Sequence, residues 1–330
     1  MNSAGDISAR DHARVQVGNS YSTVVHSYPD PNRCLADLRL ADPREEKARI
    51  EQTKGGLFRD SYKWILDNDQ FCRWQKDSRS RVLWIKGDPG KGKTMLMCGI
   101  IDELSRPGRP DSETRQKNKG VKAVVDKLSY RLGLSNSSHC PGLLSFFLCQ
   151  ATDTRLNTAV AVLRGLIYHL LCQERCLVKH LQEKYDHGNR RIFEGPTAFF
   201  SLSQTLLAML GDPVAKNVCL IVDALDECET DLHQLLDFIV QTSTANNVKW
   251  IVSSRNRLDV EQRLHLDHAR TRLSLELNAE QITHAVKRYI HHRISGLVSL
   301  RDDSSLRAKI LNGMLEKSNG TFLWAALVVQ

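Results

Sequence analysis

The sequence predicts an α/β fold in which a parallel β-sheet is covered by helices on both faces. From Arg81 onward, short apolar runs alternate with amphipathic stretches of helical period, which is typical of consecutive β–α–β units. One strand-to-helix junction also carries a complete glycine-rich phosphate-binding motif. Fold and motif therefore point to the same class of protein.

Five strands are expected in this part of the chain, each a short apolar run. They are Val82–Lys86, Leu143–Cys149, Val218–Asp223, Lys249–Ser253 and Arg272–Leu277. The helices expected between and after them have apolar residues near 3.6-residue spacing. They are Thr94–Leu104, Thr158–Gln173, Thr197–Leu210, Asp231–Gln241 and Ala279–Ile294.

The region before the sheet has two parts. Residues 1–31 are polar with one short alternating piece, and we expect a flexible N-terminal segment there. Residues 32–80 are charged and helical in pattern, with Tyr62, Ile65, Leu66 and Phe71 near helical spacing. This predicts a small helical preamble to the sheet domain.

The chain of 330 residues carries 46 Lys and Arg against 38 Asp and Glu, a net charge of +8. Residues 105–141 hold eight of these basic residues and three acids, so 8 − 3 = +5 lies in one segment that opens with Pro, Gly and Ser. It lacks the interleaved aromatics that stack on bases. We interpret it as a solvated basic insertion, mostly disordered over 106–120 with one amphipathic helix over 121–134; nucleic-acid binding through it is the least favoured hypothesis.

No apolar stretch approaches the roughly 18 residues that cross a bilayer, and the N-terminus has no signal-peptide pattern. We therefore expect a cytoplasmic protein with no membrane partner.

The phosphate-binding motif follows the strand VLWIK and matches G-x-x-x-x-G-K-[ST] in full. Its backbone N–H groups and the start of the next helix would hold phosphate oxygens. Lys93 would reach the β- and γ-phosphates, and the Thr94 hydroxyl would bind Mg²⁺. The nucleotide-binding residues predicted are Gly87, Asp88, Pro89, Gly90, Lys91, Gly92, Lys93 and Thr94.

Acidic residues follow the strand Val218–Asp223, where an open parallel sheet binds its ligands. Asp223 is the predicted second Mg²⁺ ligand, while Asp226 or Glu227 would position the attacking water or accept its proton. Asp226 and Glu227 could instead be N-terminal charges of the next helix. Arg255, which follows the strand at 249–253, is a candidate γ-phosphate sensor, or it pairs with the acidic cluster.

In these motifs the sequence resembles the NACHT family of STAND NTPases, particularly the fungal NOD-like proteins linked to self/non-self recognition. The resemblance covers roughly Cys34 to Val329. The segments that carry it include GGLFRDSYKWIL (55–66), GDPGKGKT (87–94), LIVDALDEC (220–228), WIVSSRNR (250–257) and GTFLWAALV (320–328).

The resemblance implies a P-loop NTPase sheet of the additional-strand type, with order 5-1-4-3-2, and a NACHT domain over 81–294. It implies the roles given above for Lys93, Thr94, Asp223 and Arg255, makes Asp226 and Glu227 the extra NACHT acids, and places 60–66 near the base. Residues 295–330 would begin a C-terminal helical region, which we expect to be truncated here.

The function that follows is a nucleotide-dependent signalling switch, in which slow hydrolysis of ATP or GTP with Mg²⁺ controls homo-oligomerisation. The alternative is an assembly scaffold that binds nucleotide without hydrolysing it. No guanine-reading N-K-x-D element is present, so the sequence leaves ATP and GTP both open.

Overall fold

The computed structural model describes residues 31–106, 142–244, 247–264, 270–297, 304–318 and 320–328. The flexible segment expected up to residue 30 and the disorder and helix expected within 107–141 lie outside the described residues. Within the described parts, none of the helices is both long enough and apolar enough to cross a membrane.

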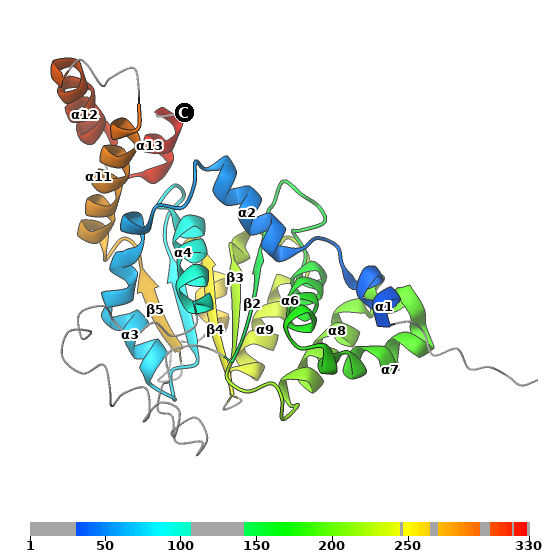
Figure 1. Ribbon diagram of the computed structural model, residues 1–330. Helices are drawn as coiled ribbons and strands as arrows, with labels where there is room; N and C mark the ends of the chain where they lie inside the picture. Colours follow the sequence, from blue (N-terminus) through cyan, green and yellow to red (C-terminus); the bar gives the residue numbers. More distant parts are fainter. Residues whose placement is uncertain are drawn as a thin grey trace, which may run out of the picture.

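The centre of the molecule is a five-stranded parallel sheet (Figure 1). The strands are β1 (Val82–Lys86), β2 (Leu143–Leu148), β3 (Val218–Asp223), β4 (Val248–Ser254) and β5 (Arg270–Ser274). They lie in the order β2-β3-β4-β1-β5, which confirms the predicted order 5-1-4-3-2. Because β4 pairs with both β1 and β3, its last residues meet the ends of these two strands at one edge.

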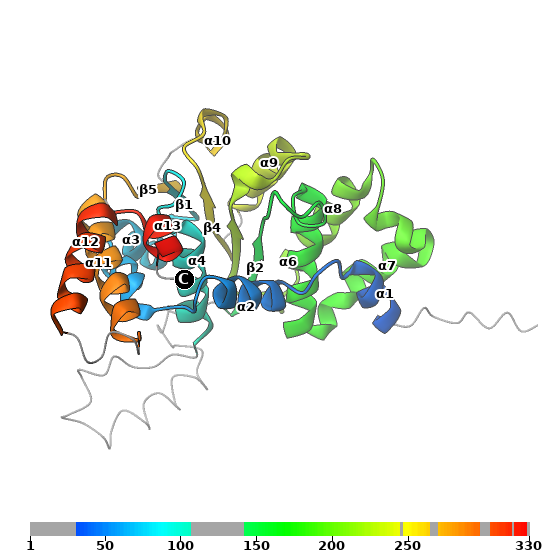
Figure 2. The same ribbon diagram turned by 90° about the horizontal axis from the view of Figure 1, so that it is seen from above.

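Two clusters of buried side chains, one on each face, hold the sheet between helices. Alternate β1 residues divide between them: Val82 and Trp84 face one cluster, and Leu83 and Ile85 the other. Strands buried on both faces are characteristic of sheets covered by helices on each side. Figure 2 shows α8 and α9 on one side of the strands and α4 and α11 on the other.

The helices of the sheet domain and C-terminal region follow the expected pattern with some additions. They are α4 (Lys93–Ser105), α6 (Ala159–Gln173), α7 (Lys179–Gly188), α8 (Ala198–Leu210), α9 (Leu232–Thr242), α10 (Leu258–Leu264), α11 (Ala279–Ser295), α12 (Ser304–Ser318) and α13 (Phe322–Val328). Single turns of 3-10 helix lie at Arg175–Val178, Asn189–Phe193 and Leu225–Glu227. At the β2 end of the sheet, α1 packs beside α7, while α11, α12 and α13 pack together at the β5 end (Figure 1).

The preamble is helical, as predicted, but it is divided into short elements. They are α1 (Pro31–Leu38), α2 (Pro43–Thr53), the 3-10 turns η1 (Arg59–Ser61) and η2 (Lys63–Asp67), and α3 (Asp69–Lys76). The division before α3 has a local cause, because the Asn68 side chain accepts hydrogen bonds from the N–H groups of Gln70 and Phe71. Such a side chain caps the start of a new helix.

The predicted end of the fifth strand is wrong. β5 ends at Ser274, and residues 275–278 form a turn instead of continuing to Leu277. The turn is fixed by Asn278, whose side chain donates to Ser274 O and whose N–H donates to Leu275 O. Leu277 is consequently 84% exposed.

Candidate functional site

The predicted phosphate loop lies between the end of β1 and the start of α4. Gly90 and Gly92 have φ of 80° and 83°, values that side chains with a Cβ rarely adopt. Gly92 is the N-cap of α4, so Lys93 and Thr94 form the first turn of that helix. The free N–H groups of such a turn, together with the helix dipole, make it suited to an anion.

The Lys93 ammonium is folded back onto this loop. Its Nζ donates to Gly87 O at 2.6 Å and to Asp88 O at 3.1 Å. Burial lowers the pKa of Lys93, while the negative charges of Asp226 and Asp223 act in the opposite direction. The loop therefore holds a partly desolvated cation at its centre, where phosphate oxygens could replace the two carbonyls.

Asp223, the last residue of β3, is 1% exposed. Its carboxylate accepts hydrogen bonds from the hydroxyls of Ser253 and Thr94. The Ser253 oxygen in turn accepts the Ala224 N–H at 2.9 Å. Burial raises the pKa of Asp223, and the two hydroxyl bonds oppose this. A carboxylate and a hydroxyl brought together in this way form a donor set that suits Mg²⁺.

Asp226 and Glu227 lie in the 3-10 turn after β3, and both are engaged by neighbouring loops. Arg255 donates to Asp226 through its backbone N at 2.9 Å and through Nε at 3.0 Å. Glu227 accepts the Ala151 N–H at 2.9 Å from the loop after β2. α9 begins only at Leu232, so the two acids are not first-turn residues of that helix. Arg255 forms an ion pair with Asp226, which is the second of the two interpretations that the sequence allowed for this arginine.

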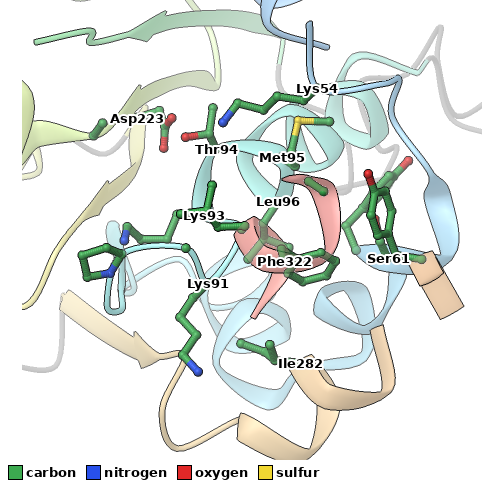
Figure 3. A pocket seen from close by; sticks show the side chains of 18 of the residues that line it. Lys54, Ser61, Lys91, Lys93, Thr94, Met95, Leu96, Asp223, Ile282 and Phe322 are labelled. Carbon is green, nitrogen blue, oxygen red and sulfur yellow. The ribbon is translucent and has the colours of Figure 1, made fainter. Parts of the chain in front are cut away.

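These groups line one cleft of about 370 Å³. Figure 3 shows Lys93, Thr94 and Asp223 at its polar end and Phe322 and Ile282 toward the other. The described lining of the polar end comes from three segments, which lie at or after the ends of β1, β3 and β4. It comprises Pro89, Gly90, Lys91, Gly92, Lys93, Thr94, Asp223, Ala224, Asp226, Glu227 and Arg255.

Most of the rest of the cleft is lined by residues from the preamble and from the C-terminal helices, and we call this set of residues the outer wall. It comprises Lys54, Gly56, Phe58, Ser61, Tyr62, Trp64, Ile282, Tyr289, Phe322, Leu323, Ala326 and Leu327. Phe58 stacks on His292 of α11 with ring centroids 4.1 Å apart. The segment 60–66, which the resemblance places near the base, supplies three of these residues.

The C-terminal part of the wall rests directly on the phosphate loop. Leu323 donates its backbone N–H to Gly90 O at 3.2 Å. A Cβ at Gly92 would lie 2.7 Å from Cδ2 of Phe322, closer than side chains approach one another. Gly92 is thus required by the approach of this segment as well as by its φ angle, and a Cβ at Gly90 would lie 3.1 Å from Cβ of Leu323.

Two predicted loop residues lie outside the lining of the cleft. A Cβ at Gly87 would lie 2.9 Å from Cβ of Leu275, so this glycine allows close packing against the segment after β5. Asp88 donates its N–H to Glu276 at 2.7 Å and accepts from the Asn256 side chain at 2.8 Å. Both residues fasten the loop to the neighbouring strand ends.

The sequence did not identify Lys54, Phe58, Ile282, Tyr289 or Phe322 as individual site residues. Phe58 and Phe322 fall within segments that carry the family resemblance, which was the available signal. Lys54, by contrast, directly precedes such a segment and has no local pattern to mark it.

Comparison with known proteins shows the family of the chain. Residues 60–255 match the family described as "Nephrocystin 3, N-terminal". The chain is also 48% identical over 299 residues to the vegetative incompatibility protein HET-E-1 of Podospora anserina, which covers 90% of this chain. The chain spans about a fifth (20%) of the length of that relative. The chain belongs to the Nephrocystin 3 N-terminal family and, as its motifs predicted, is a fungal NACHT-type P-loop NTPase of the NOD-like kind.

Proposed function

We propose that this chain is the nucleotide-binding part of a signalling switch, which binds ATP or GTP with Mg²⁺ and hydrolyses it slowly. One observation carries the proposal: the hydroxyl of Thr94 and the carboxylate of Asp223 are hydrogen-bonded to each other in the cleft that Lys93 also lines. This is the set of groups that a triphosphate and its metal ion require.

Each group has a distinct part in binding. The N–H groups from Gly90 to Thr94 would surround the phosphates, and Lys93 would exchange its two carbonyl partners for phosphate oxygens. Thr94 and Asp223 would hold Mg²⁺, which neutralises the developing charge of phosphoryl transfer. Because burial makes the charged form of Asp223 costly, a bound cation would relieve an unfavourable state of the apo protein.

The rest of the cleft would hold the base and ribose. The outer wall is largely apolar and aromatic, with Phe58, Tyr62, Tyr289 and Phe322 among its residues. Flat rings of this kind pack well against a purine of either type. The wall therefore supports nucleotide binding and leaves both ATP and GTP as ligands.

Hydrolysis would depend on Asp226, Glu227 and Arg255. Glu227 or Asp226 would position a water molecule against the γ-phosphate or take its proton. A γ-phosphate would also compete with Asp226 for the guanidinium of Arg255, whose side chain is 55% exposed. Exchange of that ion pair couples the presence of the γ-phosphate to the loops after β3 and β4.

The output of such a switch would be homo-oligomerisation in the cytoplasm during NOD-like self/non-self recognition. The relative of Podospora anserina, named for vegetative incompatibility, supports this setting. A ligand shifts a two-state protein only through its different affinity for the two states. The Arg255–Asp226 pair is the contact through which triphosphate and diphosphate would differ.

One observation favours the second candidate, an assembly scaffold that keeps its nucleotide intact. Asp226 is paired with Arg255, and Glu227 is bound to the Ala151 N–H, so both candidate bases are engaged by the protein itself. In this case the bound nucleotide would be a structural ligand.

Nucleotide content and single-turnover hydrolysis of the purified chain decide between these candidates. We expect purified protein to carry or bind nucleotide in a Mg²⁺-dependent manner and to convert bound triphosphate to diphosphate within hours. Binding without conversion would establish the scaffold. No binding of ATP or GTP at any Mg²⁺ concentration would contradict both.

A further inference from the structure

A lysine outside the phosphate motif enters the same cleft. Lys54 is the C-cap of α2, and its side chain lines the cleft together with Thr94, Met95 and Asp223. Figure 3 shows this side chain extended into the cleft with its nitrogen directed toward Thr94. The preamble thus supplies to the outer wall a cation that is directed toward the polar end of the site, from 39 residues before Lys93 (93 − 54 = 39).

The turn that carries Lys54 has a defined backbone. Lys54 donates its N–H to Ile50 O at 3.0 Å, and Gly56 donates to Glu51 O at 2.7 Å. Gly55 and Gly56 have φ of 84° and 90°, the left-handed conformation in which glycines commonly end a helix. This turn therefore fixes the position of the Lys54 backbone beside the cleft.

The helix before the turn is tied to α4, the helix that begins with Lys93. Lys47 is 9% exposed and forms ion pairs with Asp102 of α4 at 2.6 Å and with Glu51 at 2.5 Å. On the other side, Arg293 of α11 donates to Gly55 O at 3.2 Å. Contacts with α4 and with α11 therefore fix the backbone around Lys54 relative to the phosphate loop.

Three lysines line the cleft, Lys54, Lys91 and Lys93, and the first and last of them differ in their partners. Lys93 is bound to two carbonyl groups of its own loop. In the part of the chain that the structure describes, no hydrogen bond or ion pair holds the ammonium of Lys54, and its side chain is exposed. An unpaired ammonium in a cleft that also concentrates anionic ligands is available to a phosphate oxygen without first breaking another contact.

We propose that Lys54 is a phosphate-binding residue, whose ammonium contacts the phosphate chain of the nucleotide on the side of Thr94 and Met95. This rests on the proposed function, because it assigns a further cation, beside Lys93 and Arg255, to the same ligand. No bond is made or broken in this step; the interaction is an ion pair between ammonium and a non-bridging oxygen. The preamble helix α2 then belongs to the nucleotide site.

The test compares ligands that share the phosphate chain. Affinities of the chain for ATP, GTP and inorganic tripolyphosphate are measured for the parent, Lys54→Ala and Lys54→Arg. The matched control is Lys76→Ala, since Lys76 is an exposed lysine in the last turn of α3, outside the cleft. We expect Lys54→Ala to weaken binding of all three ligands about tenfold, as loss of one charge-assisted contact would. Lys54→Arg should stay within about threefold of the parent, and Lys76→Ala should match it.

The outcomes separate this proposal from the proposed function. Binding by the parent with unchanged affinity in Lys54→Ala overturns the proposal alone. Loss of ATP affinity without loss of tripolyphosphate affinity also overturns it, because the lysine would then contact base or ribose. A parent that binds none of the ligands contradicts the proposed function and this proposal with it. Should Lys54→Ala unfold, Lys54→Gln repeats the comparison with a side chain of similar length.

Discussion

The two ends of the cleft are built in different ways. At the polar end, the loop from Pro89 to Thr94 is one continuous segment, and Asp223 reaches it from β3, which is separated from β1 by β4 in the same sheet. The outer wall brings together residues more than 200 positions apart, such as Phe58 and Phe322. The polar end is therefore fixed by the sheet, while the wall depends on how the two ends of the chain pack.

This contrast predicts that substitutions at the polar end affect binding and chemistry strongly, whereas those in the wall have smaller effects. Four substitutions test it, in order of decreasing effect on the nucleotide.

Lys93→Ala should abolish nucleotide binding, with at least a hundredfold loss of affinity for ATP and GTP. The side chain bonds only to Gly87 O and Asp88 O among the described residues, so its loss should leave the fold intact. Calorimetric titration measures the affinity, and circular dichroism checks the fold. Lys309→Ala, an exposed lysine on α12, is the control. Equal affinity in Lys93→Ala and the parent would refute the assignment of the phosphate loop.

Glu227→Gln should preserve nucleotide binding and slow hydrolysis by roughly 10²–10⁴-fold, the usual contribution of a general base. The amide can still accept the Ala151 N–H through its oxygen, so the local structure should be retained. Single-turnover assays with labelled triphosphate measure the rate. Glu229→Gln, two residues further on and exposed, serves as control. Unchanged turnover would transfer the role to Asp226 or remove it from both acids.

Phe322→Ala tests the outer wall. The ring lies against Gly92 and packs near Tyr289, with ring centroids 6.0 Å apart. We expect nucleotide affinity to fall about tenfold, equivalent to about 1.4 kcal/mol, mainly through faster dissociation. Stopped-flow measurement with a fluorescent nucleotide follows this rate. Leu306→Ala, an exposed position on α12, should change nothing. A hundredfold effect of Phe322→Ala would show that the wall matters as much as the polar end.

His169 lies in α6 away from the cleft, and it should affect stability without affecting the nucleotide. Burial lowers its pKa to about 4 from the model-peptide value of 6.5, and its Nδ1 accepts the Phe146 N–H at 3.4 Å. Between pH 6.5 and 4 the unfolded chain binds more protons than the native one, so stability falls as the pH is lowered, by up to about 3 kcal/mol.

His169→Gln should remove this acid-dependent loss and leave nucleotide affinity at pH 7.5 unchanged. Urea unfolding at pH 7.5, 6 and 5 measures the slope. His284→Gln, at an exposed position of α11, should keep the slope of the parent. The same pH dependence in His169→Gln and the parent would exclude His169 as its source.

The polar end was largely predictable because its signals are local. The spacing of Gly87, Gly92 and Lys93 is itself the motif, and four apolar residues before Asp223 indicated a buried strand that ends at the sheet edge. The strand order followed from the family resemblance. What the sequence left open was the pairing of Arg255 with Asp226, which depends on side chains from two separate loops.

The outer wall was not predictable from local patterns. No local pattern indicates that Lys54 will meet the cleft, and the resemblance that includes Phe58 does not indicate its contact with α11. Both contacts depend on the docking of the preamble. Local hydrogen bonds from side chains to the backbone also ended elements that the apolar pattern predicted to continue. Asn68 divides an apolar helical pattern, and Asn278 ends β5 before Leu277; in each case an amide side chain satisfies backbone groups that a longer element would have used.

The hydrogen bond between Leu323 N and Gly90 O joins α13 to the phosphate loop through main-chain atoms alone. Side-chain substitutions in either segment cannot delete these two atoms. Thermodynamic linkage then imposes a reciprocity: if nucleotide binding alters the free energy of seating α13 on the loop, seating α13 alters nucleotide affinity by the same factor. The work needed to draw α13 away from the loop, by a force or by a partner, would therefore differ according to which nucleotide the loop holds.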